Sequence, residues 1–485
     1  MTIDEGVTAG AVASAASESP DAAGALTSLP DDVRADYLDR VAQLRAEYRA
    51  IPATAQVRLA KRTSNLFRIR GEAPVAGLHV DRFDGVLAVD PVARTADVLG
   101  MTTYEHLVDA TLPHGLMPLV VPQLKTITLG GAVTGLGIES SSFRVGLPHE
   151  SVLEMDILTG SGEVITARPD NEFADLFFGF PNSYGTLGYA LRLRIDLAPV
   201  RPFVELTHHR FDSAVAAAAA MAEIGDTGRY DGRGVDFCDG TVFNADEQYL
   251  TVGRMVDSAP YLSDYTGREI YYKSIPERHR DYLTIRDYIW RWDTDWFWCS
   301  AGVGAQNRWV RPLIPRRYLR SDTYFGIINY TRRHGLVDFY DRVRRHGRRE
   351  FVIQDVEVPV DRLGEFLDFF HREVAISPVW LCPLRQRDPD RTWDLYVMEP
   401  DVTYVNVGFW SSVPIAAGAA EGDVNRAIEV EVARLHGRKS LYSSSYYPPD
   451  EFWDIYNGPA YVKLKERYDP DRRLLDLYEK CVAGR

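Results

Sequence analysis

Residues Thr126–Ser142 read Thr-Ile-Thr-Leu-Gly-Gly-Ala-Val-Thr-Gly-Leu-Gly-Ile-Glu-Ser-Ser-Ser and are the most informative stretch of the chain. Four glycines stand among small hydroxyl residues, with no lysine, arginine or proline. Glycine lets the backbone approach a ligand closely and adopt positive φ without strain. Successive backbone N–H groups in such a loop can hold an anionic diphosphate without a metal. The stretch therefore indicates a nucleotide cofactor, with a tight turn in a β-rich domain as the alternative.

Two familiar nucleotide-binding loops are excluded by the flanking residues. A P-loop requires Lys-Ser or Lys-Thr directly after its last glycine, whereas Gly137 is followed by Ile-Glu. A Rossmann fingerprint requires glycine or alanine where Ser140 stands, and it follows a strand. Here Pro118 and Pro122 break any long strand before the loop. The cofactor site is therefore expected to belong to another fold.

The rest of the chain predicts a large α+β protein with two or more domains, since 485 residues can bury a sizeable core. Helical periodicity predicts a helix at Asp31–Ile51. Two β-rich runs at Ser151–Thr159 and Glu163–Ala167, joined by Gly-Ser-Gly, predict a hairpin. An alanine-rich helix at Ala214–Ile224 opens a region in which strands and helices alternate. Residues 1–30 have few large apolar side chains and are expected to be disordered.

Composition narrows the class of protein. A net charge of −14 argues against general nucleic-acid binding. Four cysteines without a CxxC pair favour buried thiols over a zinc site or a disulfide framework. We find no signal peptide and no apolar run long enough to cross a bilayer, so a cytoplasmic protein is expected. The cysteine spacing gives no reason to expect a bound metal.

Longer phrases carry a resemblance to a known family. They are Gly135-Leu-Gly-Ile-Glu-Ser-Ser-Ser142, Pro378-Val-Trp-Leu-Cys-Pro383 and Glu451-Phe-Trp-Asp-Ile-Tyr456. Their order resembles the vanillyl-alcohol-oxidase superfamily of flavoproteins with a PCMH-type FAD-binding domain, and within it the delta-24 sterol reductase (Diminuto/seladin) branch. The resemblance implies a discontinuous FAD-binding domain (residues 31–200, with a returning segment at 446–485) around an α/β substrate or cap domain (residues 201–445).

The resemblance also implies that FAD is bound without a covalent link. Relatives that link the flavin use a histidine in a loop where this chain has Arg58–Asn65, without histidine or cysteine. The second usual attachment position falls among Ser140–Ser142, which are not suitable nucleophiles. For Lys61, Ser64 and Asn65, the alternative interpretation is a polar surface loop that does not contact the cofactor. The expected cofactor contacts are Lys61, Ser64, Asn65, Pro122, Thr126, Thr128, Leu129, Gly130, Gly131, Ala132, Gly135, Gly137, Ile138, Glu139, Ser140, Ser141, Thr186 and Gly188.

The chemistry that this branch implies is the reduction of an isolated carbon–carbon double bond. A flavin supplies hydride to one carbon. Without a neighbouring carbonyl, protonation of the other carbon leads to a tertiary carbocation, so a buried acid with a raised pKa is expected. Asp355 and Glu357 share one face of the strand-like run Phe351–Val358, with a structural hydrogen-bonded pair as the alternative. The phenolic candidates are Tyr184, Tyr404 and Tyr446.

Two features concern the substrate. Tyrosine and tryptophan crowd residues 261–298; as a cluster they indicate a hydrophobic channel, whereas for any one of them ordinary core packing is the better interpretation. Arg308–Arg349 contains twelve arginines against three aspartates. This basic stretch would attract anionic phospholipid headgroups at the inner face of the plasma membrane or the extra phosphate of NADPH, with a solvated face as the alternative. The expected substrate contacts are Trp290, Trp292, Trp296, Trp380 and Arg385.

The chain is similar to actinobacterial members of the branch. In these, a methyltransferase using S-adenosylmethionine adds a methylene carbon in mid-chain of a phospholipid-linked fatty acyl group. The flavoprotein then reduces it to a methyl branch of the tuberculostearic type. We therefore expect an alkene reductase of lipid metabolism with NADPH as electron donor and that methyltransferase as functional partner. The alternatives are a sterol side-chain reductase, a sugar or alcohol oxidase of the same fold, and a flavin-containing scaffold without turnover.

Overall fold

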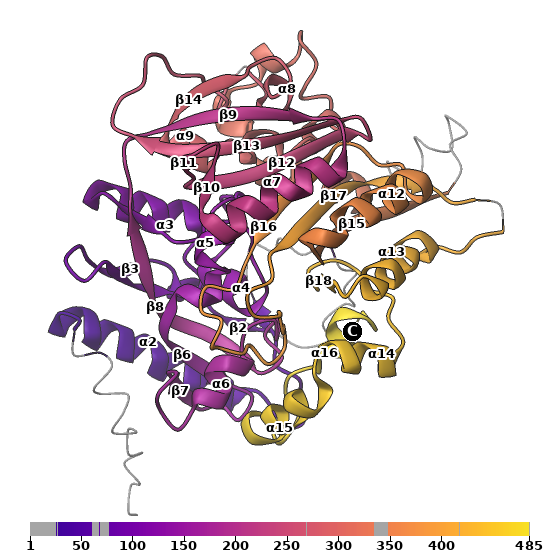
Figure 1. Cartoon of the computed structure of the whole chain (residues 1–485). Helices are drawn as coiled ribbons and strands as arrows, with labels where there is room; N and C mark the ends of the chain where they lie inside the picture. The colour runs from indigo at the N-terminus through magenta and orange to yellow at the C-terminus, as the bar shows by residue number, and fades with distance from the viewer. Residues whose placement is uncertain are drawn as a thin grey trace, which may run out of the picture.

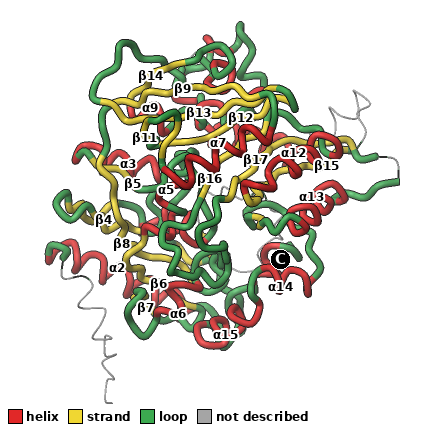
Figure 2. Tube along the Cα trace, in the orientation of Figure 1, coloured by secondary structure: helices red, strands yellow, loops and turns green. Residues whose placement is uncertain are grey.

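The protein is built on two β-sheets, which lie one above the other in Figure 1. The computed structural model describes residues 26, 28–60, 67, 77–267, 269–333, 348–416 and 418–484, with the backbone alone at 328–333. Figure 2 separates the strands of the two sheets from the helices that flank them. The expectation for residues 1–30 lies almost wholly outside the described residues.

The N-terminal sheet has six strands in the order β3-β4-β8-β6-β7, with β5 paired to β8. All of these pairings are antiparallel. A separate parallel pair joins β1 to β2. The elements are α2 (Asp31–Ala50), β1 (Leu59–Ala60), β2 (Leu78–His79), β3 (Val86–Asp90), β4 (Thr95–Leu99), α3 (Tyr104–Thr111), β5 (Leu116–Pro118), α4 (Leu129–Thr134), α5 (Ser142–Val145), β6 (Val152–Thr159), β7 (Val164–Ala167), α6 (Ala174–Gly179) and β8 (Gly188–Pro199).

Two secondary-structure predictions for this half are confirmed. Helix α2 begins directly after Pro30 and buries Tyr37, Leu44 and Tyr48. Strands β6 and β7 form the expected hairpin. Strand β5 ends at Pro118, because proline has no N–H to continue a ladder.

A fully buried arginine fastens this sheet to α2. The Arg192 guanidinium on β8 forms ion pairs with Asp97 on β4 and with Glu154 and Asp156 on β6. The Tyr37 hydroxyl of α2 donates to the Asp156 carboxylate at 2.7 Å. Removal of one member would leave an uncompensated buried charge, which costs about 3–5 kcal/mol.

The larger sheet has eight strands in the order β14-β9-β13-β12-β16-β17-β15-β18, and every pairing is antiparallel. Strands β10 (Arg229–Tyr230) and β11 (Arg233–Gly234) form a separate short hairpin. The other elements are β9 (Phe203–Phe211), α7 (Ala214–Thr227), β12 (Phe237–Asn244), β13 (Glu247–Val256), α8 (Tyr271–Ser274), β14 (Arg280–Thr284), α9 (Ile285–Ile289), α10 (Ser321–Arg333), β15 (Arg349–Pro359), α12 (Leu363–Glu373), β16 (Val379–Leu384), β17 (Tyr404–Pro414), α13 (Asp423–Arg434) and β18 (Arg438–Lys439).

Helices α7, α12 and α13 cover one face of the larger sheet, as Figure 1 shows. Their buried side chains pack with Val352, Val356 and Val358, which alternate along β15. The predicted alanine-rich helix is confirmed as α7, capped by the Ser213 hydroxyl. The opposite face is aromatic and shares one hydrophobic core with the N-terminal sheet. The two sheets therefore meet across a buried aromatic junction.

The C-terminal segment consists of α14 (Pro449–Ile455), α15 (Gly458–Tyr468) and α16 (Leu477–Cys481). The Lys465 ammonium donates to the Thr186 carbonyl at 2.7 Å, and the Ser161 amide donates to the Tyr468 carbonyl at 3.0 Å. Figure 1 shows α15 beside α6. The segment thus packs on the N-terminal half, while the expected boundaries at residues 200 and 446 stay predictions.

In the described part of the chain, none of the helices has both the length and the apolar character needed to cross a bilayer. The same residues include no group of three or more His, Cys, Asp or Glu side chains arranged to hold a metal ion.

Candidate active site

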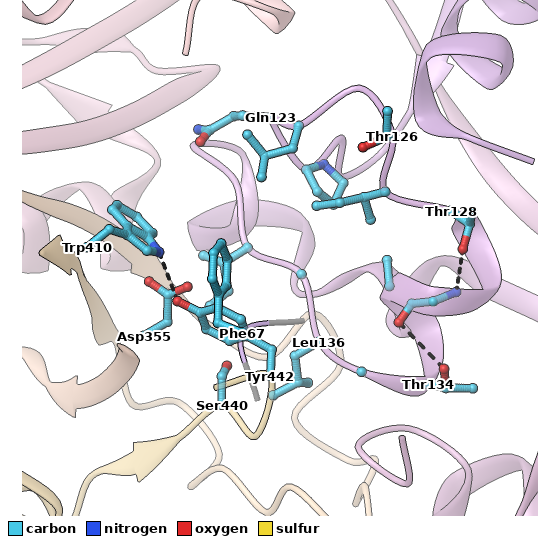
Figure 3. A pocket seen from close by; sticks show the side chains of 18 of the residues that line it. Phe67, Gln123, Thr126, Thr128, Thr134, Leu136, Asp355, Trp410, Ser440 and Tyr442 are labelled. Atoms are coloured by element: carbon cyan, nitrogen blue, oxygen red, sulfur yellow. Dashed lines mark hydrogen bonds between the residues drawn. The ribbon is translucent and has the colours of Figure 1, made fainter. Parts of the chain in front are cut away.

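A cavity that is partly open to solvent lies where the two sheets meet. Figure 3 shows it from close by, with the Gly-rich segment on one side and Asp355, Trp410 and Tyr442 on the other. It is lined by Phe67, Pro122, Gln123, Leu124, Thr126, Ile127, Thr128, Gly131, Ala132, Thr134, Gly135, Leu136, Gly137, Ile138, Tyr184, Trp296, Phe297, Asp355, Trp380, Trp410, Ser440 and Tyr442.

The Gly-rich wall differs from the loop that the sequence of Thr126–Ser142 predicts. Residues Leu129–Thr134 form the short helix α4, and none of the glycines in Thr126–Ser142 has positive φ. The Thr128 hydroxyl caps α4 by accepting from the Gly131 amide at 3.2 Å. The Thr134 hydroxyl donates to the Gly130 carbonyl at 2.7 Å.

Close packing explains the glycines better than backbone conformation does. A Cβ on Gly130 would lie 2.6 Å from the Gly100 carbonyl oxygen, and one on Gly137 would lie 2.9 Å from both Pro122 Cγ and Pro148 Cγ. Any larger residue would push the segment away from the N-terminal sheet. The Gly-rich wall is thus held close to the sheet that supports it.

The backbone amides of this wall have different partners. The N–H of Gly130 donates to the Gly100 carbonyl at 2.9 Å and so holds α4 on the sheet. The N–H of Gly131 has a rotatable hydroxyl as its partner, and Gly131 borders the cavity. Of Gly130 and Gly131, both expected cofactor contacts, Gly131 is therefore better placed to bind a ligand in the cavity.

Tyr184 reaches the cavity from a loop of unusual backbone conformation. Asn182, Tyr184 and Gly185 have φ of +61°, +50° and +74°. The side-chain amide of Asn182 donates to the Leu395 carbonyl at 2.8 Å. The backbone N–H of Tyr184 donates to the Thr134 carbonyl at 2.8 Å. A left-handed tyrosine costs free energy and persists only where its surroundings hold it. The fold therefore fixes this phenol beside Gly135.

Trp296 and Phe297 form the aromatic wall and also lie in the left-handed region, at φ +44° and +59°. The Phe297 ring stacks on Trp410 with centroids 4.4 Å apart, and the Trp296 ring stacks on Phe67 at 5.6 Å. Two consecutive bulky residues with positive φ are rare in proteins. Their cost at this cavity wall is consistent with a functional role.

A buried carboxylate positions part of this wall. Asp239 Oδ2 accepts from Arg291 Nη2 at 2.7 Å, from Trp292 Nε1 at 3.0 Å and from Trp380 Nε1 at 3.2 Å. The Arg291 guanidinium lies 3.9 Å from the centroid of the Tyr288 ring. Trp380 is therefore fixed in orientation while its ring borders the cavity.

Three adjacent strands bring the polar end of the cavity together. In the sheet register, Gly408 on β17 is paired with Asp355 on β15 and with Trp380 on β16. A Cβ on Gly408 would lie 2.4 Å from Asp355 Oδ1 and 2.7 Å from the Trp410 ring. Because Gly408 has no side chain, the Asp355 carboxyl and the rings of Trp380 and Trp410 come together above it.

Asp355 has the properties of a proton donor. Burial raises its pKa to about 7, although hydrogen bonds from Asn406 and Tyr442 lower it. The Asn406 amide donates to Oδ1 at 3.3 Å. The Trp410 indole N–H donates to the Tyr442 oxygen at 2.9 Å, which leaves the phenol hydrogen for Asp355. The carboxyl is thus available in its neutral form near neutral pH.

Glu357 is fully buried behind Asp355 on the same face of β15. Burial raises its pKa to about 8, the hydrogen bond from Tyr396 lowers it, and the charge of Asp355 raises it further. Two carboxyls that disfavour each other's ionisation titrate as a pair. The shared face predicted from alternation is confirmed, but Asp355 alone borders the cavity.

Several expected site residues do not line this cavity, and the roles assigned to them stay predictions. The Arg385 guanidinium forms ion pairs with Asp226 at 3.0 Å and Asp401 at 2.9 Å. The amide of Tyr446 donates to Glu429, and the hydroxyl of Tyr404 accepts from the Glu399 amide. Buried side chains outside the lining are Trp290, Trp292, Leu129 and Thr186, and Gly188 packs on β6.

The Glu-Ser-Ser phrase after the glycines forms a junction between the two sheets. The hydroxyls of Ser140 and Tyr288 share a hydrogen bond of 2.7 Å. The backbone N–H of Cys238 donates to the Ser140 carbonyl at 2.7 Å. Glu139 Oε1 lies 3.6 Å from Arg291 Nη2. The Ser141 hydroxyl donates to the Leu119 carbonyl at 2.8 Å. Ser140 and Ser141 are hydrogen-bonded to protein partners, and none of these three expected cofactor contacts borders the cavity.

The structure adds residues that the sequence did not single out. Gln123 lines the cavity, and its buried side-chain nitrogen has no hydrogen-bond acceptor among the described residues. Ser440 and Tyr442 enter from the segment after β18, and Trp410 enters from β17. The expected contacts Lys61, Ser64 and Asn65 lie outside the described residues.

The residues that line the cavity fit FAD in their chemistry. Glycines at Gly131, Gly135 and Gly137 leave room along one wall where other residues would project side chains. The Gln123 amide supplies an unused donor, and neutral hydroxyl and amide groups are appropriate for a diphosphate. The opposite wall is aromatic, as a flavin ring and an apolar substrate both require.

Comparisons with known proteins agree with this geometry. Residues 38–168 match the family model described as an FAD binding domain. The chain is 26% identical over 451 residues to the Delta(24)-sterol reductase of Arabidopsis thaliana, covering 83% of this chain and 76% of that protein. It is 26% identical over 424 residues to the Homo sapiens Delta(24)-sterol reductase, covering 84% of this chain and 76% of that protein. Cytokinin dehydrogenase 2 of Oryza sativa subsp. japonica is 25% identical over 419 residues, covering 79% and 72%.

The glycine-lined cavity, the two-sheet α+β architecture and the matched family model point to the same cofactor. Residues 38–168 accordingly match an FAD binding domain, in a chain that is similar along most of its length to Delta(24)-sterol reductases.

Proposed function

We propose that this protein is an FAD-dependent oxidoreductase that reduces an unactivated, branched carbon–carbon double bond in a lipid. The observation that carries the proposal is the Asp355 carboxyl, which borders the cavity together with Trp380 and Trp410 and has a pKa of about 7. A neutral acid in an aromatic pocket suits an alkene that has no polar group to activate it.

The residues proposed to hold the cofactor are those of the Gly-rich wall. Thr128 and Gly131 present a hydroxyl and an amide for the diphosphate, and Gln123 presents its free amide donor. A bound flavin supplies hydride to the substrate from N5. The absence of histidine and cysteine from residues 58–65 and 140–142 supports a non-covalent complex.

Asp355 is proposed to donate its proton to one alkene carbon as hydride reaches the other. Protonation of the methylene carbon places the developing positive charge on the more substituted carbon. The aromatic faces of Trp380 and Trp410 border that position and stabilise a cation through their π-electrons. Tyr442 and Asn406 keep the carboxyl oriented toward the cavity.

The substrate is proposed to be the mid-chain methylene group of a phospholipid-linked acyl chain, reduced to a methyl branch with NADPH as electron donor. An S-adenosylmethionine-dependent methyltransferase would supply that substrate. The second candidate is a sterol side-chain alkene, which the similarity to Delta(24)-sterol reductases favours. Both present a branched alkene on an apolar chain, and the aromatic lining accommodates either.

The test is an anaerobic assay with purified protein and NADPH. Methylene-branched phospholipid and a sterol with an unsaturated side chain are offered separately, and products are measured by mass spectrometry. Conversion of the phospholipid to its methyl-branched form supports the acyl substrate, and conversion of the sterol alone supports the second candidate. A flavin-containing protein that reduces neither would refute the proposal, and so would a protein that cannot be loaded with FAD.

A further inference from the structure

Residues 307–318 form an exposed surface of unusual composition, here called the Arg/Trp segment. They read Asn-Arg-Trp-Val-Arg-Pro-Leu-Ile-Pro-Arg-Arg-Tyr, with four arginines and no acidic residue. The side chains of Trp309 and Leu313 are 71% and 81% exposed. Val310 and Tyr318 are also exposed. Large apolar side chains gathered in this way on a surface indicate an interaction site.

The Arg/Trp segment is held in place by a buried ion pair. Arg311 is 4% exposed, and its guanidinium contacts both carboxylate oxygens of Asp295, at 2.6 and 2.9 Å. It also donates to the carbonyls of Gly267 and Glu269. The outward positions of Trp309 and Leu313 on either side of this anchor therefore belong to a fixed surface.

The same anchor joins the Arg/Trp segment to the cavity wall. Asp295 directly precedes Trp296, which lines the cavity. Beyond the segment, the Phe325 ring of α10 packs edge-on against Trp296 and Phe67, with centroids 6.0 and 5.8 Å apart. Two residues further along α10, Ile327 is 43% exposed. The Arg/Trp segment is thus joined to the cavity wall through Arg311, Asp295 and Trp296.

We propose that the Arg/Trp segment docks the protein on an anionic phospholipid bilayer. Among the described residues, Arg308 and Arg317 have no acidic partner, and each guanidinium lies over the ring of its neighbour, at 4.7 Å from Trp309 and 4.8 Å from Tyr318. Tryptophan and tyrosine prefer the headgroup level of a membrane, and arginine attracts anionic lipid.

The charge of the whole chain determines which face approaches the membrane. At a net charge of −14, most of the protein is repelled by an anionic surface, whereas the Arg/Trp segment is attracted to it. The inference deepens the proposed function, because a docked protein receives an acyl chain beside Trp296 without passing it through water. Its test measures binding alone and so stands apart from any assay of turnover.

The charge arm of the test compares vesicles of phosphatidylglycerol with vesicles of phosphatidylcholine in a sedimentation assay with the full chain. Binding is expected on the anionic vesicles and is expected to fall with added salt. Arg308→Gln with Arg317→Gln should weaken binding by about fivefold for each arginine. The double variant Arg308→Lys with Arg317→Lys keeps the positive charge and should retain most of the binding to anionic vesicles.

The apolar arm uses Trp309→Ser with Leu313→Ser, which should weaken binding by about tenfold. Val92→Ser with Val215→Ser is the matched control, since both valines are exposed elsewhere, at 93% and 71%. Circular dichroism checks that each variant is folded. Unchanged binding by both Arg/Trp segment variants would overturn the proposal. Concentration-dependent dimers that are lost in the Trp309/Leu313 variant, without lipid binding, would assign the surface to a second copy instead.

Discussion

Replacement of Asp355 by asparagine removes the proposed proton donor with little change in shape. Asparagine retains a hydrogen-bonding partner for Asn406 and Tyr442 but has no acidic proton to give. General acid catalysis contributes about a hundred- to ten-thousandfold to a rate. We therefore expect Asp355→Asn to lower the rate of alkene reduction by that factor while the flavin content stays at the parent level.

The pH dependence gives a second, independent signature. Because the pKa of Asp355 is about 7, its acid form decreases tenfold for each pH unit above that value. The single-turnover rate of the parent should follow this decline, and the residual rate of Asp355→Asn should lack it. Rapid mixing of reduced protein with lipid, under nitrogen at several pH values, measures both rates.

The substitution should not lower stability. The pKa of Asp355 is higher in the folded protein than the ordinary 3.8, so the folded state holds the proton more tightly. The free energy of unfolding of the parent therefore falls as pH rises from about 4 to about 7, by at most about 4 kcal/mol. Contact with the open cavity reduces this figure. Asp355→Asn lacks this titration. The free energy of unfolding of Asp355→Asn, measured in urea, should therefore exceed that of the parent by a margin that grows as pH rises over the same range.

The reasoning about Asp355 fails if Asp355→Asn reduces the alkene at the parent rate. It also fails if the loss of rate is accompanied by a matching loss of folded protein. Glu357→Gln is the matched comparison on the same strand face, because Glu357 does not border the cavity. It should alter the pH profile more than the maximal rate.

Three further predictions concern the surroundings of the cavity. Gly408→Ala should displace the Asp355 carboxyl, whose Oδ1 would lie 2.4 Å from the new Cβ, and lower turnover at normal flavin content; a parent-like rate would contradict this. Gly131→Val should project into the cofactor wall and lower the FAD absorbance of purified protein, and full flavin loading would contradict this. Asp239→Asn should leave Arg291 buried without its carboxylate and lower the free energy of unfolding by about 3–5 kcal/mol, measured in urea; an unchanged midpoint would be the contrary result.

Local pattern predicted part of the fold and one catalytic candidate. Alternation in β15 placed Asp355 on the face opposite Val356, and that face meets the cavity. Periodicity and capping predicted α2 and α7 closely. These features depend on neighbours within a few residues, which the sequence presents directly.

Long-range pairing could not be predicted in the same way. Trp410 and Tyr442 join Asp355 only because β15 pairs with β17 and β18, from positions far along the chain. The glycines were interpreted as a loop, since the sequence does not reveal that Gly100 lies within 3 Å of the position where Gly130 would carry a Cβ. The charge cluster around Arg192 was missed because its partners come from separate strands.

The most direct test of the central claim is a single turnover of the reduced protein. Protein loaded with FAD is reduced under nitrogen, freed of reductant and mixed with a branched-alkene lipid. The account predicts that the flavin absorbance returns and that one saturated lipid forms for each flavin reoxidised. A protein that binds no FAD, or whose reduced flavin is not reoxidised by either lipid class, would contradict it.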